Sequence, residues 1–399
     1  MSDNYNALLG IRVLDMTRVL AGPFCGMLLA DMGAEVIKLE VPDRGDDSRE
    51  FPPFKDGKSL YYINLNRGKK SITINLKHQE GKLVFLELIK QCDVVIENFS
   101  PGTMERLNLG YDKLKEVNPK IIYAAISGFG QTGPYRNRPG YDIIGQAMGG
   151  LLSITGWQDS PPTRSGTAIG DILSSLFCCI GILSALNVRE RTGRGQLVDV
   201  SLVDSVYASL ENIPQRYFIE GLIPGRIGNR YEFIYPYDTF QAKDGWVVIA
   251  VANEQLWSRF LEVSKLTHLS GDPRYKSNSL RVENHFTLKE EIEKWSGQLE
   301  KDAIVTLLNK NRVPSCPIYN IKDASEDPHI AGARSMVIKI NQPSLGTINV
   351  QGNPIKMSET DPKPRGPAPA LGEHTVEVLS NLLKLSGLEI QKLREEGAI

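Results

Sequence analysis

Residues 11–40 read IRVLDMTRVLAGPFCGMLLADMGAEVIKLE, and the pattern in this stretch decides the fold. A short strand-like run from Ile11 to Leu14 is followed by an apolar helical pattern from Cys25 to Asp31 and a second strand-like run from Glu35 to Leu39. Strands that alternate with helical patterns are typical of βαβ units, in which consecutive strands lie parallel. The stretch therefore predicts the start of a parallel sheet covered by helices.

The same alternation continues to about residue 203, which predicts an α/β fold with a large Rossmann-like domain. A Gly/Pro-rich stretch from Gly128 to Gly140 interrupts it once. The expected strands are Ser71 to Asn75, Asp93 to Glu97, Ile121 to Ser127 and Gln196 to Val203, and the expected helices are Glu80 to Gln91, Tyr111 to Val117 and Asp171 to Arg191.

The composition changes at Pro224 to Arg230, where Pro, Gly and Arg residues gather. Beyond this break, strand-like runs are followed by helical patterns through Leu308, which predicts a smaller α+β domain. An amphipathic tail from His374 to Glu396 is expected to pack back on the first domain. We therefore expect a large domain at residues 1–200, a linker at 201–230, a small domain at 231–325, and a linker with the carboxy-terminal return at 326–399.

Composition and charge exclude several classes of protein. Hydrophobic residues make up 41% of the 399 residues and charged residues 23%, which is ordinary for a globular chain. The 46 Lys and Arg residues against 47 Asp and Glu residues give a net charge of −1, so neither nucleic acid nor a membrane surface is an expected partner. No signal peptide and no apolar run of the ~20 residues that span a bilayer are recognised in the sequence, so we expect neither export nor membrane insertion.

The cysteines and histidines favour neither disulfides nor a metal site. The five cysteines are odd in number and scattered, without the paired spacing of metal ligands, which favours a reducing cytoplasm. The histidines form no HxxxH motif, and no GxSxG elbow occurs. Residues Gly22 to Gly26 do not form GxGxxG, so NAD binding is disfavoured.

Two aspartates at predicted helix starts are candidates for chemistry. Asp171 opens the apolar segment from Ile172 to Leu186, and Asp142 follows Tyr141 at the start of another helical pattern. An aspartate at such a place is most often a helix cap that accepts backbone N–H bonds, and the same carboxylate could serve as a nucleophile. The residues alone leave both interpretations open.

Candidate ligand-binding residues follow the predicted strands. Residues Asn98 to Gly102 come directly after the strand Asp93 to Glu97, and ligands of open α/β sheets bind beyond the carboxyl ends of the strands. Basic residues near strand ends would suit a polyphosphate ligand, although scattered surface charges fit the same pattern. These basic residues are Arg67, Lys69, Lys70, Lys77 and Arg106.

A series of motifs in order resembles the class III CoA-transferase family, which includes formyl-CoA, carnitine and 2-hydroxyacyl CoA-transferases and related 2-methylacyl-CoA racemases. The motifs are VLDMTRVLAGP at 13–23, GAEVIKLE at 33–40, ENFSPG at 97–102, SGFGQTGP at 127–134, GD at 170–171, TGRGQ at 192–196 and LGEHT at 371–375. The resemblance implies ring-like subunits interlocked in a homodimer, each with a large Rossmann-like domain built from both chain ends.

The resemblance also implies an activity and its residues. Asp171 would be the nucleophile that exchanges CoA between carboxylic acids, beside Tyr141 and Asp142, with no metal and no cofactor other than the CoA thioester substrate. The implied CoA contacts are Arg18, Val19, Ile74, Lys77, Asn98, Phe99 and Arg106.

Departures from the family pattern refine the expected substrate. Leu20 replaces a glutamine and Val41 an arginine of the formyl-CoA members, and their active-site run of glycines is absent, so formate and oxalate are not expected. A medium-sized 2-hydroxy acid, such as the 2-hydroxyisocaproate of amino-acid fermentation, is the expected acceptor. A racemase is the alternative, but Tyr141 stands where racemases carry a histidine acid/base. A non-catalytic acyl-CoA-binding protein is the third possibility.

Overall fold

The computed structural model describes residues 6–399, which divide into two compact units. The larger unit holds residues 6–151, 164–215 and 327–399, and the smaller holds 152–163 and 216–326. The expected boundaries differ from this division, because residues 152–163 group with the smaller unit. The expected linker at 201–230 also divides, with residues 201–215 in the larger unit and 216–230 in the smaller one. Contacts between residues distant in sequence decide this grouping, and a change in local composition does not report them.

A six-stranded sheet forms the centre of the larger unit, and every neighbouring pair of its strands is parallel. The expected α/β fold with a parallel sheet is thus confirmed. The order across the sheet is that of a Rossmann fold, with the first strand of the chain in the middle. Across the sheet the strands are β5 (Lys70–Thr73), β2 (Glu35–Glu40), β1 (Arg12–Asp15), β6 (Val94–Glu97), β7 (Ile122–Ser127) and β8 (Leu197–Ser201).

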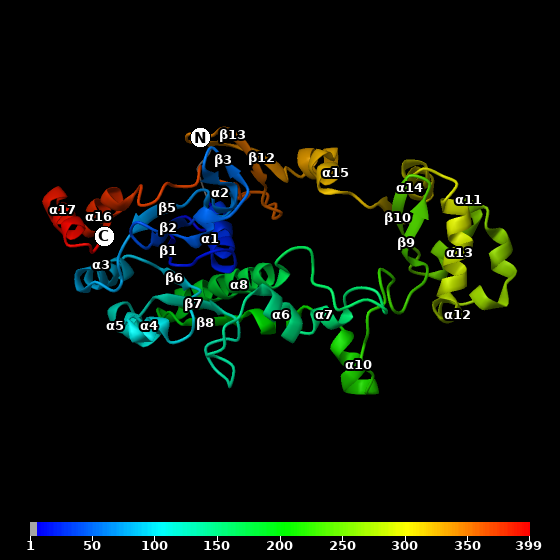
Figure 1. Cartoon of the computed structure of the whole chain (residues 1–399), viewed down its shortest axis with the longest axis horizontal. Coiled ribbons are helices and arrows are strands. Elements are labelled where there is room, and N and C mark those ends of the chain that lie inside the picture. Colours follow the sequence, from blue (N-terminus) through cyan, green and yellow to red (C-terminus); the bar gives the residue numbers. More distant parts are fainter. Residues whose placement is uncertain (1–5) are drawn as a thin grey trace. The chain divides into compact units, whose positions relative to one another are not determined.

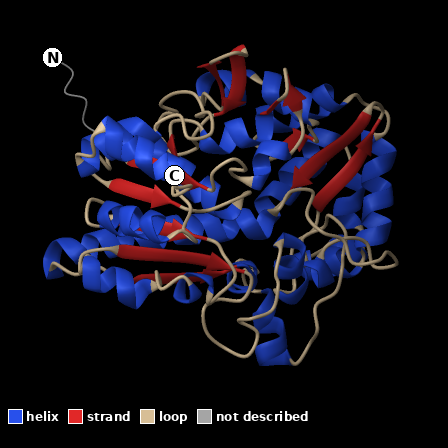
Figure 2. Ribbon diagram, turned by 60° about the vertical axis from the view of Figure 1, so that its left-hand side comes forward, coloured by secondary structure: helices blue, strands red, loops and turns tan. Residues whose placement is uncertain are grey.

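Alternate residues of the central strands pack into two separate cores, one on each face of the sheet. Val13 packs with α1 (Ala21–Asp31) and α8 (Ile169–Thr192) on one face. Its neighbour Leu14 packs on the other face with α3 (Gln79–Ile89), α5 (Tyr111–Val117) and α16 (Thr375–Leu383). Burial on both faces explains why these strands read as continuous apolar runs, and Figure 2 shows the helices flanking the strands.

Helix α8 has 24 residues and is long and apolar enough, by length and composition, to cross a membrane. The expectation that no apolar run approaches this length was therefore wrong. Within the larger unit α8 packs against α1, α9 (Leu202–Ala208), β7 and β8, and its Cys178 and Cys179 are buried there. Packing in the α/β core accounts for the apolar residues on the buried face of this helix, whereas Leu176, Phe177 and Ile180 are exposed.

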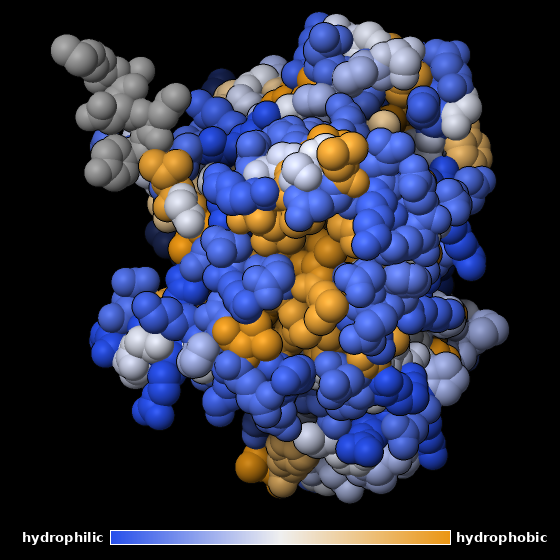
Figure 3. All heavy atoms as spheres, turned by 90° about the vertical axis from the view of Figure 1, so that its left-hand side faces the viewer, coloured by the Kyte–Doolittle hydropathy of each residue, from blue (hydrophilic) through white to orange (hydrophobic). Residues whose placement is uncertain are grey.

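The carboxy-terminal tail covers the edge of the sheet formed by β5. The Thr73 N–H donates to Thr375 Oγ1 at 3.1 Å, and the His374 N–H donates to the Ser71 carbonyl at 2.8 Å. Helix α16 thus lies beside β5 and α3, and α17 (Gly387–Glu395) contacts α16 (Figure 1). Hydrophilic residues cover most of this side of the molecule, and apolar residues gather in a central strip (Figure 3). Through its hydrogen bonds to the β5 backbone, the tail covers a strand edge that would otherwise be open to pairing with another chain.

Shorter elements complete the larger unit. Helix α6 (Asp142–Met148) contacts both α8 and α9. The remaining described elements are α2 (Leu60–Asn66), α4 (Thr103–Arg106), the hairpin of β3 (Phe54–Lys55) and β4 (Lys58–Ser59), the hairpin of β12 (Val337–Gln342) and β13 (Gly346–Gln351), the 3-10 turn Asp47–Glu50 and the π turn Pro328–Ala333. Helices α7 (Leu151–Ile154) and α10 (Ile213–Glu220) lie where the chain passes between the units.

The smaller unit contains an antiparallel sheet in the order β11-β10-β9, packed against helices. Phe240, Phe260 and Leu288 are fully buried in its core. Its elements are β9 (Tyr237–Ala242), β10 (Gly245–Ala250), β11 (Ser315–Pro317), α11 (Glu254–Ser264), α12 (Asn278–Glu283), α13 (His285–Ser296), α14 (Lys301–Lys310), α15 (Ile321–Glu326) and the 3-10 turns Thr267–Gly271 and Pro273–Tyr275.

The packing of the tail predicts a large effect at one leucine. Leu379 of α16 is fully buried against the sheet, whereas Leu388 of α17 is 80% exposed. We expect Leu379→Ala to lower the free energy of unfolding by about 2–5 kcal/mol because it leaves a cavity. Leu388→Ala is the matched control and should change it by less than about 0.5 kcal/mol. Denaturant titration measures the free energy of unfolding of both variants. Equal losses of stability in Leu379→Ala and Leu388→Ala would show that the tail is not part of the cooperative core.

Candidate active site

The chain leaves β1 toward β2 and β5 on one side, and it later returns to place β6, β7 and β8 on the other. Open α/β sheets bind their ligands at such a reversal of strand order, beyond the carboxyl ends of the strands. Here the loops that follow β1, β6 and β7 line a cavity of about 260 Å³ together with the first turn of α8. We call it the switch-point cavity.

The structure brings most of the predicted site residues to the switch-point cavity. The residues among them that line it are Arg18, Val19, Asn98, Phe99, Tyr141 and Asp171. Arg106 lines a neighbouring cavity of about 390 Å³, which shares Pro101 with the first.

Ile74 and Lys77 follow the edge strand β5 and do not line the switch-point cavity. The Ile74 side chain is buried in the core, and Lys77 is exposed.

Asp171 is the third residue of α8 and not its cap, because the helix begins at Ile169 and Ala168 occupies the N-cap position. The cap interpretation of Asp171 was therefore wrong, although a carboxylate in the first turn still interacts favourably with the helix dipole. Burial, and then the nearby charge of Asp142, raises the pKa of Asp171 to about 7. The site therefore holds a carboxylate whose ionised form is costly and whose proton exchanges near neutral pH.

Asp142 connects helix α6 to the first turn of α8. Its Oδ1 accepts the Gly170 N–H at 2.8 Å, and its Oδ2 accepts a hydrogen bond from Gln146 Nε2 at 2.7 Å. The buried Gln146 in turn accepts the Ser165 N–H at 2.9 Å through Oε1. Asp142 thus fixes the backbone beside Asp171, while the Tyr141 ring at the start of α6 is 80% exposed.

Asn98 and Arg18 hold the loops after β1 and β6 together. The Asn98 side chain accepts the Arg18 N–H at 2.9 Å and donates to the Arg18 carbonyl at 2.8 Å. The Arg18 guanidinium lies 5.7 Å from the centre of the Phe99 ring and 3.1 Å from Asp47. Half of the hydrogen-bonding capacity of the Asn98 amide is therefore used within the protein.

Val19 has a left-handed backbone conformation, with φ of +68°. For a β-branched residue this conformation is strained by about 1–3 kcal/mol and persists only when neighbouring groups enforce it. The Val19 N–H donates to Asp46 Oδ1 at 3.1 Å, and Lys38 Nζ lies 2.8 Å from Asp46 Oδ2. Burial opposes ionisation of Asp46, but the Lys38 charge and backbone donors lower its pKa to about 2. Asp46 therefore stays ionised at neutral pH.

The two ends of the glycine-rich loop between β7 and α6 meet beside the cavity. A Cβ atom on Gly128 would come within 2.8 Å of the Gly140 Cα, so neither position has room for a side chain. This contact folds the loop back on itself and places Gly128, Pro139 and Tyr141 together on the lining of the cavity. The Gly/Pro-rich stretch predicted as a simple interruption is thus a wall of the site.

A second, largely apolar cavity of about 570 Å³ adjoins the first. Leu20 lines both cavities, and Ile172 lines the second one directly after Asp171 in α8. Tyr61 also lines the second cavity, and burial, followed by the charge of Asp171, raises its pKa to about 12. We call this space the apolar cavity. The catalytic candidate Asp171 thus lies where the switch-point cavity meets the apolar cavity.

Four further residues of the site region were not predicted from the sequence: Asp46, Gln146, Tyr61 and Arg138. Gln146 lies one helical turn after Asp142, so their i, i+4 spacing was a usable signal. Nothing local distinguishes the other three. Within residues 6–399, no cluster of three or more His, Cys, Asp or Glu side chains could hold a metal ion.

Comparisons with known proteins agree with this arrangement. The family model of CoA-transferase family III matches residues 8–375. The succinyl-CoA:mesaconate CoA-transferase of Haloarcula hispanica is 43% identical over 383 residues, covering 94% of this chain and 96% of that protein. The acetyl-CoA:oxalate CoA-transferase of Acetobacter aceti is 42% identical, covering 91% of this chain and 92% of that protein.

The crystal structure of a CaiB/BaiF family protein from Brucella suis superposes with a TM-score of 0.85 at 38% identity. The match covers 95% of this chain and 100% of that one. Motifs, fold and near full-length relatives agree: the chain belongs to CoA-transferase family III.

Proposed function

We propose that this protein transfers CoA from an acyl-CoA thioester to a carboxylic acid through covalent intermediates on Asp171. The observation that carries the proposal is the position of Asp171, which lies at the strand-reversal site, in the first turn of α8 and beside an apolar cavity. A partly desolvated carboxylate in such a place suits nucleophilic attack on a thioester, because it gives up little solvation when it reacts.

In the first half-reaction, an Asp171 oxygen attacks the thioester carbonyl carbon and the C–S bond breaks. The CoA sulfur leaves as a thiolate with the bonding electron pair, and a mixed anhydride between Asp171 and the acyl group remains. The thiolate then attacks the aspartyl carbonyl, which releases the donor acid as a carboxylate. Asp171 now carries CoA as a thioester.

In the second half-reaction, the acceptor carboxylate attacks the aspartyl thioester and again expels the CoA thiolate. The thiolate attacks the acceptor side of the new anhydride, so that acyl-CoA leaves and Asp171 is restored as a carboxylate. Each step exchanges one activated acyl group for another, so neither ATP nor a further cofactor is required. Water must be excluded, since hydrolysis of any intermediate would lose the activation.

The switch-point cavity is the proposed place of CoA. Arg18 and Val19 after β1 and Asn98 and Phe99 after β6 surround it, and Phe99 offers an aromatic face. Arg138 and the neighbouring Arg106 supply guanidinium groups, which bind phosphates in a bidentate manner. This distribution supports a phosphate-bearing ligand with its reactive end at Asp171.

The apolar cavity is the proposed place for the body of the acyl and acceptor groups. Its Leu20, Phe24 and Leu60 side chains favour an aliphatic chain. This supports the expected 2-hydroxy acid acceptor, whereas the relatives' names point to dicarboxylic acids, mesaconate and oxalate. A relative named for oxalate at 42% identity also weakens the argument against that acid. Rates with 2-hydroxyisocaproate, mesaconate and oxalate as acceptors separate the possibilities.

We further propose that two copies associate as a homodimer, interlocked as the family resemblance implies. Helix α8 exposes Phe177 and Ile180 on the face that does not pack in the core, and the adjacent α6 exposes Ile143 and Met148. Exposed apolar side chains gathered on neighbouring helices mark an interaction surface. A second copy that covers this face would remove the exposed apolar side chains of α8 from water.

The alternative activity, racemisation of a 2-methylacyl-CoA, needs a second acid/base group beside Asp171. Tyr141 occupies the position where the racemases carry histidine, and a phenol exchanges protons at neutral pH less readily than an imidazole does. Incubation with acyl-CoA in heavy water distinguishes the two activities. Deuterium at the α-carbon without any acceptor acid would favour the racemase.

The covalent mechanism predicts that Asp171 is modified during turnover. Hydroxylamine added with acyl-CoA should convert Asp171 to a hydroxamate, which mass spectrometry detects as a change in one peptide. Asp171→Asn should lower kcat by roughly 10⁴-fold or more, because the nucleophile is lost. Asp112→Asn, in the first turn of α5 and outside the cavity, is the control and should retain activity. An unmodified Asp171 under turnover would exclude the mechanism.

The raised pKa of Asp171 predicts the pH dependence of activity. Only the carboxylate attacks, so kcat/KM should rise with pH up to about 7 and then level off. Asp142→Asn removes a negative charge that raises the Asp171 pKa, so its rising limb should lie at lower pH than that of the wild type. Steady-state kinetics across this range test both statements. A profile that is flat through neutral pH would contradict the assignment.

The dimer proposal predicts that a charge on α8 separates the copies. Ile180 is 58% exposed, so Ile180→Asp should yield monomers in size-exclusion chromatography with light scattering. Leu83 of α3 is 47% exposed on a different part of the larger unit, and Leu83→Asp is the matched control. If the wild type is itself monomeric, or both variants dissociate, α8 is not the specific interface.

A further inference from the structure

Val19, whose backbone is strained, lines the switch-point cavity. Buried charged side chains that do not line this cavity lie next to its backbone, beginning with Asp46. Asp46 Oδ1 accepts the Val19 N–H at 3.1 Å and also the Ser48 N–H and hydroxyl, each at 2.8 Å. The carboxylate therefore ties the loop after β1 to the loop after β2. Its only ion-pair partner among the described residues is Lys38, whose side chain is fully buried.

Lys38 extends this connection to the residue two positions before Val19. Its Nζ lies 2.8 Å from Asp46 Oδ2 and donates to the Thr17 carbonyl at 2.7 Å. The Thr17 N–H in turn donates to Asp15 Oδ1 at 3.0 Å, and Asp15 Oδ2 pairs with Lys69 Nζ at 2.7 Å. All four charged side chains are fully buried, so each end of the loop from Thr17 to Val19 is attached to a buried charge.

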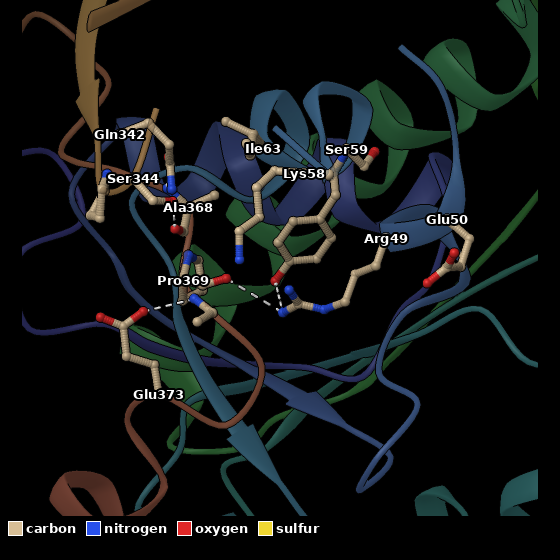
Figure 4. A pocket seen from close by; sticks show the side chains of 14 residues that line it. Arg49, Glu50, Lys58, Ser59, Ile63, Gln342, Ser344, Ala368, Pro369 and Glu373 are labelled. Atoms are coloured by element: carbon tan, nitrogen blue, oxygen red, sulfur yellow. Dashed lines mark hydrogen bonds between the residues drawn. The ribbon is translucent and has the colours of Figure 1, made fainter. Parts of the chain in front are cut away.

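The loop that carries Asp46 is itself anchored. Glu40 Oε2 accepts the Asp46 N–H at 3.0 Å, and its two oxygens bind the Arg49 guanidinium at 2.7 and 2.8 Å. Arg49 also donates to the Tyr62 hydroxyl at 2.6 Å and to the Pro369 carbonyl at 3.4 Å, and Figure 4 shows its guanidinium pointing toward Pro369. The cavity that these residues line does not include Asp171. Because Asp46 is held by these contacts, a change in the backbone conformation of Val19 would break its hydrogen bond to Asp46.

We infer that Asp46 and Lys38 are positioning residues that hold Val19 in its left-handed conformation and thereby keep the switch-point cavity in the shape that accepts CoA. This inference rests on the proposed place of CoA. Neither side chain lines that cavity, so both act through the backbone of the loop. A strained conformation that buried charges enforce is typical of ligand-binding loops, because pre-organisation lowers the cost of binding.

Asp46→Asn keeps the shape of the side chain and removes its charge. We expect the KM for acyl-CoA to rise about tenfold, the size of one lost charge-assisted hydrogen bond, while kcat stays nearly unchanged. Steady-state kinetics measure the two constants separately, and thermal unfolding measures any loss of stability. A lower kcat at unchanged KM would contradict a role in binding.

Asp93→Asn is the matched control for lost stability. Asp93 also accepts a backbone N–H, that of Arg12 at 2.7 Å, and pairs with Arg189 at 2.9 Å, but it lies at the amino ends of the strands. We expect a lower Tm and an unchanged KM. If this variant raises KM as much as Asp46→Asn does, general destabilisation explains both and the inference is wrong.

Val19→Gly tests whether strain is the reason that Asp46 matters. Glycine adopts the left-handed conformation without strain, so a Val19→Gly protein no longer needs Asp46 to hold this residue. Asp46→Asn should therefore raise KM by a smaller factor in the Val19→Gly background than in the wild type. Equal factors in both backgrounds would mean that Asp46 does not act by holding a strained residue. The cycle remains informative even if each single variant loses some affinity.

Calorimetric titration with free coenzyme A separates this inference from the proposed function. Binding by the wild type and weaker binding by Asp46→Asn would support both. Binding of equal strength by the two proteins would overturn the positioning role alone. A wild type that binds no coenzyme A would overturn the proposed function itself.

Discussion

The reversal of strand order between β1 and β6 is the constraint on which the rest of the structure depends. At this point the connections that follow the two neighbouring strands leave toward opposite faces of the sheet, which opens a crevice at the carboxyl ends of β1 and β6. The loops that follow these strands remain free to line a cavity, and α8 brings Asp171 to it. Position in the sheet, more than any single motif, makes this place the candidate site.

Charge burial is the second feature that shapes the site. Lys38, Asp46, Asp15 and Lys69 are fully buried below the loop after β1, where unpaired charges would be strongly destabilising. Each is therefore paired, and the pairs fix backbone groups near the cavity. Asp171 differs from them because its burial is joined by the negative charge of Asp142 rather than offset by a cation, so that its pKa is raised while that of Asp46 is lowered.

Much of the fold could be predicted because the signals are local. The helix from Tyr111 to Val117 was predicted with the bounds that the structure shows, and the strand at Asp93 to Glu97 differs by one residue. The predicted cap at Asp171 failed because helix α8 begins two residues earlier, and α8 itself was not foreseen as an apolar helix of membrane-spanning length. The ends of a helix and the burial of its residues depend on contacts with residues distant in sequence, which a short stretch of sequence does not report.

The sequence by itself determined the parallel α/β class through hydrophobic periodicity and the family through its motifs, because both are local properties of the chain. The resemblance to that family, and not the residues alone, made Asp171 the candidate nucleophile. Only the tertiary structure decided that Asn98 binds the Arg18 backbone, that Val19 is strained and held by Asp46, and that an apolar cavity adjoins Asp171. These contacts join residues up to 80 positions apart, and their geometry arises only when strands β1, β2 and β6 align side by side.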